Sequence, residues 1–380
     1  MALVGVLLAG LATTAAAGPR EQAKRMHDRL AGVPPTIAVL DQMETLIGAG
    51  NESGAADIAM QNPSFYNVTL KNFASPWTNR EQSVFVPLND YVATVIGMVR
   101  DDVDFSTLLS ADLTYVGQGA AANPAPSATS NAHYEALEAN NVDLSDTNLF
   151  NSTTQSSVMG IPSNATAGVM TSRAASEAFF VAGTNRAMFR FTLLNHMCND
   201  MEQMMDFKLP PDMIRQDVSR SPGGDSRLFL NNCIGCHAGM DPLAGAFAYY
   251  NWNEDTGRLE YTAGTVQSKY FNNDLNFPPG FRTPDDAWEN RWRQGQNAYF
   301  GFDESLPSSG TGAKTLGVEL GSSQAFASCQ VRKVFKTVCL REPEDATDRT
   351  RVDEITNTFR TTGYRLKQVF ADTAAYCMGS

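Results

Sequence analysis

The chain has 380 residues, of which 43% are hydrophobic and 18% are charged. This apolar content is enough to build a substantial core, so it excludes a wholly disordered protein. Acidic residues number 41 against 29 lysines and arginines, a formal net charge of −12, and without a basic surface no nucleic acid is expected as a partner. After the N-terminal residues, no stretch of about 18 residues is apolar enough to form a membrane-spanning helix. We therefore expect a mature chain without an integral membrane span.

Apolar residues recur at helical spacing along most of the chain. The predicted helices are, in chain order, residues 22–30, 36–47, 63–73, 88–99, 171–180, 187–205, 285–297, 322–340, 351–360 and 365–376. Asn89 is the expected N-cap of the fourth helix. Tyr, Thr and Val alternate in residues 254–276, a pattern compatible with one hairpin. Residues 115–164 are rich in Gly, Ala, Ser, Asn and Pro, which predicts a long irregular segment. The fold is thus expected to be mainly α, loop-rich and with few β-strands.

Residues 1–17 have the features of an export signal. They read MALVGVLLAGLATTAAA, an apolar run that ends in small residues, with Ala15 and Ala17 at the −3 and −1 positions of an A-x-A cleavage site. The first basic residue is Arg20, so the positively charged start of such signals is missing, and a buried N-terminal helix is the alternative. We expect an exported protein, in the periplasm or on the surface of a Gram-negative bacterium.

Residues 233–237 form a C-x-x-C-H motif, the attachment signature of c-type haem. The spacing follows from the chemistry, because two thiols add to the two vinyl groups of one porphyrin and the adjacent histidine ligates the iron. We predict one covalent haem c, held by Cys233, Cys236 and His237. The histidine is expected to bind iron through Nε2 while Nδ1 donates to a backbone carbonyl.

Three other interpretations of the motif are weaker. A zinc site would need a second Cys/His pair at ligand spacing, and none follows. A thioredoxin-like pair would follow a strand, whereas the preceding RLFLNN looks like the end of a helix. A simple disulfide would leave His237 without a role.

The other four cysteines, an even number, predict two disulfides in an oxidising compartment. They allow three pairings. Cys329 and Cys339 stand about 15 Å apart along one predicted helix, too far for a bridge. We favour Cys198–Cys329 with Cys339–Cys377; the alternative is that some thiols stay free and buried.

The sixth ligand of the iron is left open by the sequence. Met240 follows His237 too closely to reach the opposite face of a haem. Met378, the one methionine further downstream, is a candidate that ranks behind His196 and Met204. His196 and Met204 lie upstream in a methionine-dense predicted helix and are candidate ligands, although methionines at helical spacing more often fill a core. A site without a sixth protein ligand is an equal alternative, and it would permit small-molecule binding or activation.

Further residues near the motif are candidates for haem binding. Arg220 and Arg227 could pair with the haem propionates, or else form surface salt bridges. Phe247 and Tyr250 belong to an aromatic cluster that would wall the porphyrin, or else fill the core. Asp241, which precedes a proline, is expected to end the motif helix in a turn.

The residues around the motif, CIGCHAGMDPLAGAFAYYNW, resemble the pattern C-x-x-C-H-x-x-[MI]-D-P-x-G-x-A-[FL]-E-x-[FY]-D. This pattern marks cytochrome-c-like domain proteins of planctomycetes, myxobacteria and marine proteobacteria. RMHDRLAGVPPT and ELGSSQAFASCQVRKVF are similar to other segments of these proteins, and the similarity spans most of residues 24–377. The chain departs from the pattern at Ala248, where the family has a glutamate. It also departs from these proteins at Cys339-Leu340-Arg341, which replaces their final G-R helix segment. The resemblance implies a haem protein of the cell envelope and says little about mechanism.

Together these features predict a signal peptide at 1–17, an N-terminal helical domain at 18–114, the irregular segment at 115–164 and a cytochrome-c-like haem domain with C-terminal helices at 165–380. The favoured function is electron transfer in the cell envelope, with a redox partner that has a basic docking face. The alternatives are a haem peroxidase or oxidase with an open distal site, and a surface-assembly protein that carries haem. No catalytic residue is assigned, since no hydrolase, nucleotide-binding or zinc-protease motif is present.

Overall fold

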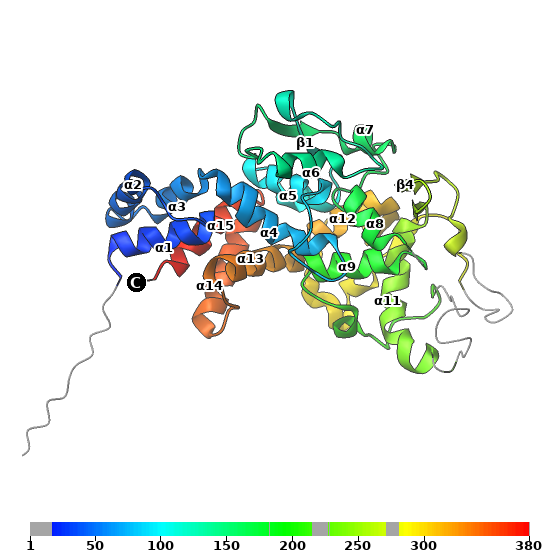
Figure 1. Ribbon diagram of the computed structural model, residues 1–380. Coiled ribbons are helices and arrows are strands. Elements are labelled where there is room, and N and C mark those ends of the chain that lie inside the picture. Colours follow the sequence, from blue (N-terminus) through cyan, green and yellow to red (C-terminus); the bar gives the residue numbers. More distant parts are fainter. Residues whose placement is uncertain (1–16, 182, 215–226, 228, 271–280, 380) are drawn as a thin grey trace, which may run out of the picture.

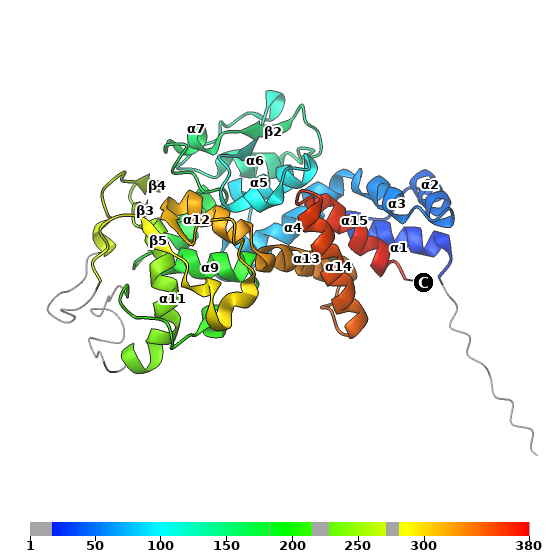
Figure 2. The same ribbon diagram turned by 180° about the vertical axis from the view of Figure 1, so that it is seen from behind.

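The structure is a computed structural model that describes residues 17–181, 183–214, 227, 229–270 and 281–379. Within these residues the expectation of a mainly α fold is confirmed, because helices predominate and the strands form only two-stranded antiparallel sheets. The molecule is elongated. One group of helices lies at the end where α1 and the C-terminus meet, and another at the end that contains α11 (Figures 1 and 2).

The first group combines both ends of the chain. Its helices are α1 (Pro19–Ala31), α2 (Ile37–Gly48), α3 (Glu52–Met60), α13 (Gln324–Cys339), α14 (Ala346–Thr361) and α15 (Leu366–Cys377). Arg25 and Arg29 of α1 donate to the carbonyls of Met378 and Cys377, at 2.6 and 2.7 Å, and so satisfy acceptors at the end of α15. The packing therefore crosses the domain boundaries predicted from the sequence.

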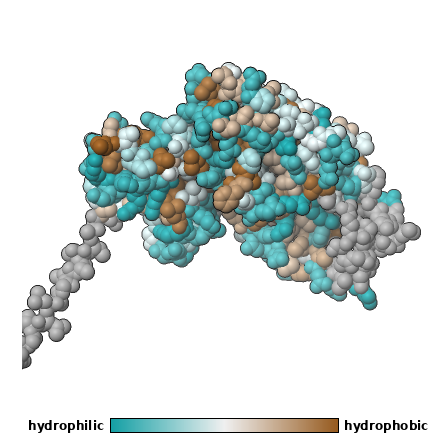
Figure 3. Space-filling view, viewed as in Figure 1, coloured by the Kyte–Doolittle hydropathy of each residue, from teal (hydrophilic) through white to brown (hydrophobic). Residues whose placement is uncertain are grey.

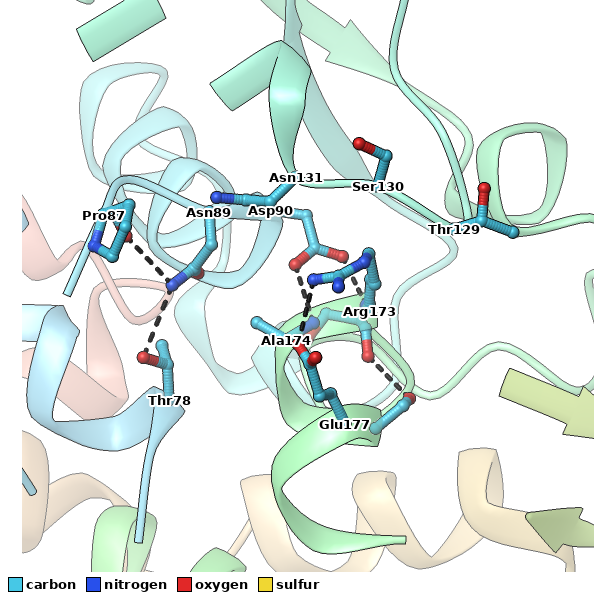
Figure 4. A network of polar contacts seen from close by, with 12 residues as sticks. Thr78, Pro87, Asn89, Asp90, Thr129, Ser130, Asn131, Arg173, Ala174 and Glu177 are labelled. Atoms are coloured by element: carbon cyan, nitrogen blue, oxygen red, sulfur yellow. Dashed lines mark hydrogen bonds and ion pairs between the residues drawn. The ribbon is translucent and has the colours of Figure 1, made fainter. Parts of the chain in front are cut away.

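Short helical segments lead from this group to the centre of the molecule. They are η1 (Phe65–Leu70), α4 (Lys71–Ala74), η2 (Ser75–Thr78) and, after α5, η3 (Phe105–Leu109). α5 (Asp90–Arg100) is buried along its whole length, and Asn89 is its N-cap, as predicted. The Asp90 carboxylate accepts hydrogen bonds from the first two backbone N–H groups of α8 (Arg173–Phe179), which ties α5 to α8 (Figure 4). Burial raises the pKa of Asp90, and these donors satisfy its oxygens.

Residues 115–164 contain more regular structure than their composition predicts. β1 (Thr114–Gly117) pairs with β2 (Phe150–Thr153). The chain between the two strands forms η4 (Gly119–Ala121) and α6 (Ala132–Ala139), and β2 is followed by α7 (Gln155–Met159). Tyr115 and Phe150 are fully buried, and β1 packs against α5. The segment is thus less irregular than expected, because strands whose partners are distant in the sequence leave little local pattern.

The second group surrounds the motif. Its helical segments are α8, α9 (Arg186–His196), η5 (Met201–Met204), η6 (Phe229–Cys233), α11 (Ile234–Ala244), η7 (Gly245–Phe247), η8 (Ser268–Tyr270), η9 (Arg291–Arg293), η10 (Gly295–Phe300) and α12 (Gly312–Gly321). The predicted hairpin is present but begins earlier, with β3 (Tyr250–Asn253) paired to β4 (Arg258–Tyr261).

The prediction of a helix at residues 285–297 is wrong. The chain instead forms β5 (Ala287–Glu289), which pairs with β6 (Ser309–Thr311), and then η9 and η10. Trp288 and Trp292 are both buried and four residues apart, a spacing that imitates a helix. Gln294 separates η9 from η10, and η10 begins at Gly295, whose φ is 74°.

The disulfide pairing favoured from the sequence is confirmed. Cys198–Cys329, with Cα atoms 5.3 Å apart, joins the segment after α9 to α13. Cys339–Cys377, with Cα atoms 5.4 Å apart, joins the ends of α13 and α15. α13 is thereby bonded to both groups of helices.

The exterior is mostly polar. Hydrophilic residues cover most of the face seen in Figure 3, and hydrophobic residues are scattered over it singly. Among the helices of the described residues, none combines the length and the hydrophobicity needed to cross a membrane.

Candidate functional site

The C-x-x-C-H motif lies at the junction of two helical segments. η6 ends at Cys233 and α11 begins at the next residue. Because residues three apart are neighbours on a helix surface, Cys233 and Cys236 emerge on the same side. Both are partly exposed and both are outside the disulfides. Four of the six cysteines thus form disulfides, and the two neighbouring cysteines of the motif remain thiols.

The thiol of Cys236 lies in surroundings that keep it protonated. It donates to the carbonyl of Met201 in η5, with Sγ 3.3 Å from the oxygen. Burial raises the pKa of Cys236, and the nearby Cys233, Glu202 and Asp200 raise it further. A redox or nucleophilic cysteine needs the opposite, a lowered pKa in electropositive surroundings. The site therefore does not favour thiol redox chemistry or nucleophilic catalysis.

The imidazole of His237 is oriented by a buried carboxylate. Its Nδ1 lies 3.0 Å from Oδ1 of Asp241, one turn further along α11. Arg186, the first residue of α9, donates from Nε and Nη2 to both oxygens of Asp241, at 2.9 and 2.8 Å. Burial raises the pKa of Asp241, but Arg186 and His237 outweigh burial and hold it well below its usual range.

This network selects the nitrogen that is suited to ligation. An ionised carboxylate only accepts hydrogen bonds, so the proton between His237 and Asp241 belongs to Nδ1. In a neutral imidazole the lone pair then lies on Nε2. The backbone carbonyl predicted as the partner of Nδ1 is wrong, because the Asp241 carboxylate occupies that place.

The motif helix packs closely against its surroundings on its other faces. A Cβ atom added at Gly239 would lie 2.0 Å from Nε1 of Trp292, which is 1% exposed. A Cβ atom at Gly235 would lie 2.9 to 3.1 Å from the ring of Phe207. The two glycines therefore let an indole and a phenyl ring approach the backbone of α11 directly.

The candidate sixth ligands lie in different places. Met204 is fully buried in η5, which packs against α11, and its sulfur accepts a hydrogen bond from Tyr299 Oη at 3.5 Å. His196 lies in the core between α5, α9 and α13, where its Nε2 is 2.6 Å from Tyr91 Oη. Met378 follows α15, at the opposite end of the molecule from α11 (Figure 1). Of the three candidates, only Met204 thus lies in a segment that packs against the motif helix. His196 contacts Tyr91 in the core, and Met378 lies at the far end of the molecule.

The other predicted residues contribute little to the described site. Arg220 lies outside the described residues, and the side chain of Arg227 is exposed. Phe247 and Tyr250 follow the C-terminal end of α11, and each packs against Phe180 with ring centroids 5.5 Å apart. Both are almost completely buried, as core residues are.

Two residues that contact the candidate site, Asp241 and Arg186, were not predicted to do so from the sequence. Asp241 stands four residues after His237, a spacing that places the two side chains together on a helix. Pro242 suggested that the helix ends there, but α11 continues to Ala244 and includes the proline. Arg186 is 55 residues before Asp241, and no local pattern connects them.

Within the described residues, no three His, Cys, Asp or Glu side chains converge to hold a bare metal ion. A haem does not need such a group, because the porphyrin supplies four nitrogen ligands and the protein adds axial ones. Two thiols and one oriented imidazole are the donors that covalent haem attachment requires, so the residues present fit this group. Comparisons with models of known protein families, with curated proteins and with solved structures found no match to the chain.

Proposed function

We propose that the protein is an exported c-type cytochrome that holds one covalent haem at Cys233, Cys236 and His237 and transfers electrons in the cell envelope. The observation that carries the proposal is the pair of neighbouring free thiols beside an imidazole whose Nδ1 is fixed by Asp241. The resemblance to cytochrome-c-like domain proteins supports the same function.

Attachment needs no reagent beyond the haem. Each thiol adds across one vinyl group, so that sulfur bonds to one vinyl carbon and the thiol hydrogen goes to the other. No atom leaves and no oxidant is consumed, and the protein gains the mass of one haem.

When bound, the haem would supply one-electron redox chemistry at its iron. His237 would hold the iron through Nε2, and Asp241 would keep the ring in one tautomer and one orientation. The net charge of −12 favours a redox partner with a basic docking face and an association rate that falls with ionic strength.

Export is supported by the two disulfides, which form in oxidising compartments. The predicted signal segment lies almost entirely outside the described residues. Fractionation of a native host, with the cytochrome detected by its haem, would test the location.

Expression in a host equipped for cytochrome maturation tests the attachment. We expect the wild type to carry the mass of one haem and the Cys233→Ala/Cys236→Ala variant to lack it. The matched control, Cys198→Ser/Cys329→Ser, removes two other cysteines and should keep the haem. A colourless wild type of bare polypeptide mass would overturn the proposal.

A haem enzyme is the second candidate function, and the carboxylate beside His237 favours it. A hydrogen bond from Nδ1 to a carboxylate raises the basicity of the ligand and stabilises oxidised iron. Rapid cyanide binding by the ferric protein and peroxide-dependent oxidation of a dye would support the enzyme. A low-spin ferric spectrum that cyanide does not change would support the electron carrier.

A further inference from the structure

The buried ion pair beside the motif suggests a function beyond haem attachment. We propose that Asp241, held by Arg186, is a positioning residue that strengthens His237 as an iron ligand and lowers the reduction potential of the protein. This inference rests on the proposed haem function, and it concerns two residues that make no contact with iron themselves.

The hydrogen bond between His237 and Asp241 is strengthened by burial and charge. Asp241 is 0% exposed, and a charged acceptor in a buried site bonds more strongly than a neutral carbonyl at the surface. Partial transfer of the Nδ1 proton toward this carboxylate leaves more electron density on the imidazole. A more electron-rich ligand stabilises ferric over ferrous iron, so the potential falls.

Arg186 stabilises the buried carboxylate and holds it in place. A lone buried carboxylate would be costly and would take up a proton, since burial disfavours its charged form. Arg186 meets both oxygens, at 2.9 and 2.8 Å, and so pairs the buried carboxylate with an opposite charge. Oδ1 of Asp241 accepts hydrogen bonds from both Nε of Arg186 and Nδ1 of His237. The arginine therefore also fixes the position of the oxygen to which the histidine donates.

The chain contains a matched control pair near the same motif. Arg190 donates to both oxygens of Asp200, at 2.7 and 2.6 Å, which is the same bidentate geometry. Their side chains are 50% and 30% exposed. Asp200 influences the Cys236 thiol electrostatically but belongs to a different hydrogen-bond network from His237. Its removal reports the effect of charge without the effect of the histidine bond.

The experiment measures the reduction potential of four holoproteins by spectroelectrochemistry, with haem content checked by intact mass. They are the wild type, Asp241→Asn, Arg186→Lys and Asp200→Asn. We expect Asp241→Asn to shift the potential upward by clearly more than Asp200→Asn. Arg186→Lys keeps the positive charge but cannot make both bonds, so its potential should lie between those of the wild type and Asp241→Asn.

The outcomes separate the two proposals. A wild type that carries haem, with shifts in Asp241→Asn and Arg186→Lys no larger than that of Asp200→Asn, overturns this inference and leaves the cytochrome intact. A wild type without haem overturns both. If Asp241→Asn does not fold, Arg186→Lys decides alone, and an unchanged potential in that variant overturns the inference.

Discussion

Nδ1 of His237 lies 3.0 Å from a carboxylate oxygen of Asp241, one turn along the same helix. This contact orients the imidazole, because it fixes the ring tautomer and leaves the lone pair on Nε2, the nitrogen that the proposed haem would use. The carboxylate is buried and kept ionised by an arginine from another helix. The ligand side of the site is therefore built by α9 and α11 together.

Gly239 is required for the packing of the motif helix. An added Cβ at this position would lie 2.0 Å from the buried indole of Trp292, so Gly239→Ala should destabilise the protein by about 1–3 kcal/mol. Gly48, at the end of α2, has no neighbouring atom within 4 Å of an added Cβ, and Gly48→Ala should be neutral or slightly stabilising. Chemical denaturation of both variants checks this prediction. Equal stability of the two would contradict it.

The two disulfides should differ in their contribution to stability. Cys198–Cys329 spans 131 residues and Cys339–Cys377 spans 38. By the loop-entropy model, removal costs about 5 kcal/mol for the first and about 4 kcal/mol for the second. Denaturant unfolding of the two double serine variants would show the order. A larger loss for the shorter loop would show that loop entropy does not govern these bridges.

His196 should make folding sensitive to mild acid. Burial, and then the charge of Lys333, lower the pKa of His196 well below its ordinary value. The unfolded chain takes up a proton below about pH 6.5 while the native state does not, so the unfolding free energy falls as the pH decreases, by up to about 1.4 kcal/mol per pH unit. Unfolding titrations at pH 7.5, 6.5 and 5.5 should show a weaker pH dependence in His196→Gln than in the wild type.

Tyr91→Phe is the control for this effect. It removes the hydrogen bond to His196 but leaves the imidazole buried, so it should lower stability at every pH and retain the pH dependence. Because the contacts of His196 lie away from the motif, His196→Gln should also leave the haem spectrum unchanged. A pH dependence equal to that of the wild type in His196→Gln, or a changed spectrum, would contradict the assignment of this residue to the core.

The sequence predicts the strongly amphipathic helices well and the irregular connections poorly. The helix expected at 322–340 is α13 (Gln324–Cys339), because its apolar periodicity and its N-cap serine are both local signals. The same reasoning fails for residues 285–297. Two buried tryptophans stand four residues apart here, as they would on one face of a helix, but they lie in a strand and a 3₁₀ turn. Spacing alone does not distinguish the two cases.

The candidate site divides in the same way. The thiols and the imidazole are accessible from the sequence through the motif spacing. Helical geometry excludes only one of the three disulfide pairings, so the choice between the other two is not constrained by the sequence. The Arg186–Asp241 pair is not accessible from the sequence either, since it depends on how α9 crosses α11. The proline after Asp241 also indicated a turn where the helix in fact continues.

The central claim is tested most directly by counting alkylated cysteines in the denatured wild type by intact mass, before and after reduction. The chain has six cysteines, and four of them form disulfides. With Cys233 and Cys236 in thioethers, we predict no alkylation before reduction, four alkylations after it, and the mass of one haem in both spectra. Two alkylations before reduction and six after it, on a chain of bare polypeptide mass, would contradict the account.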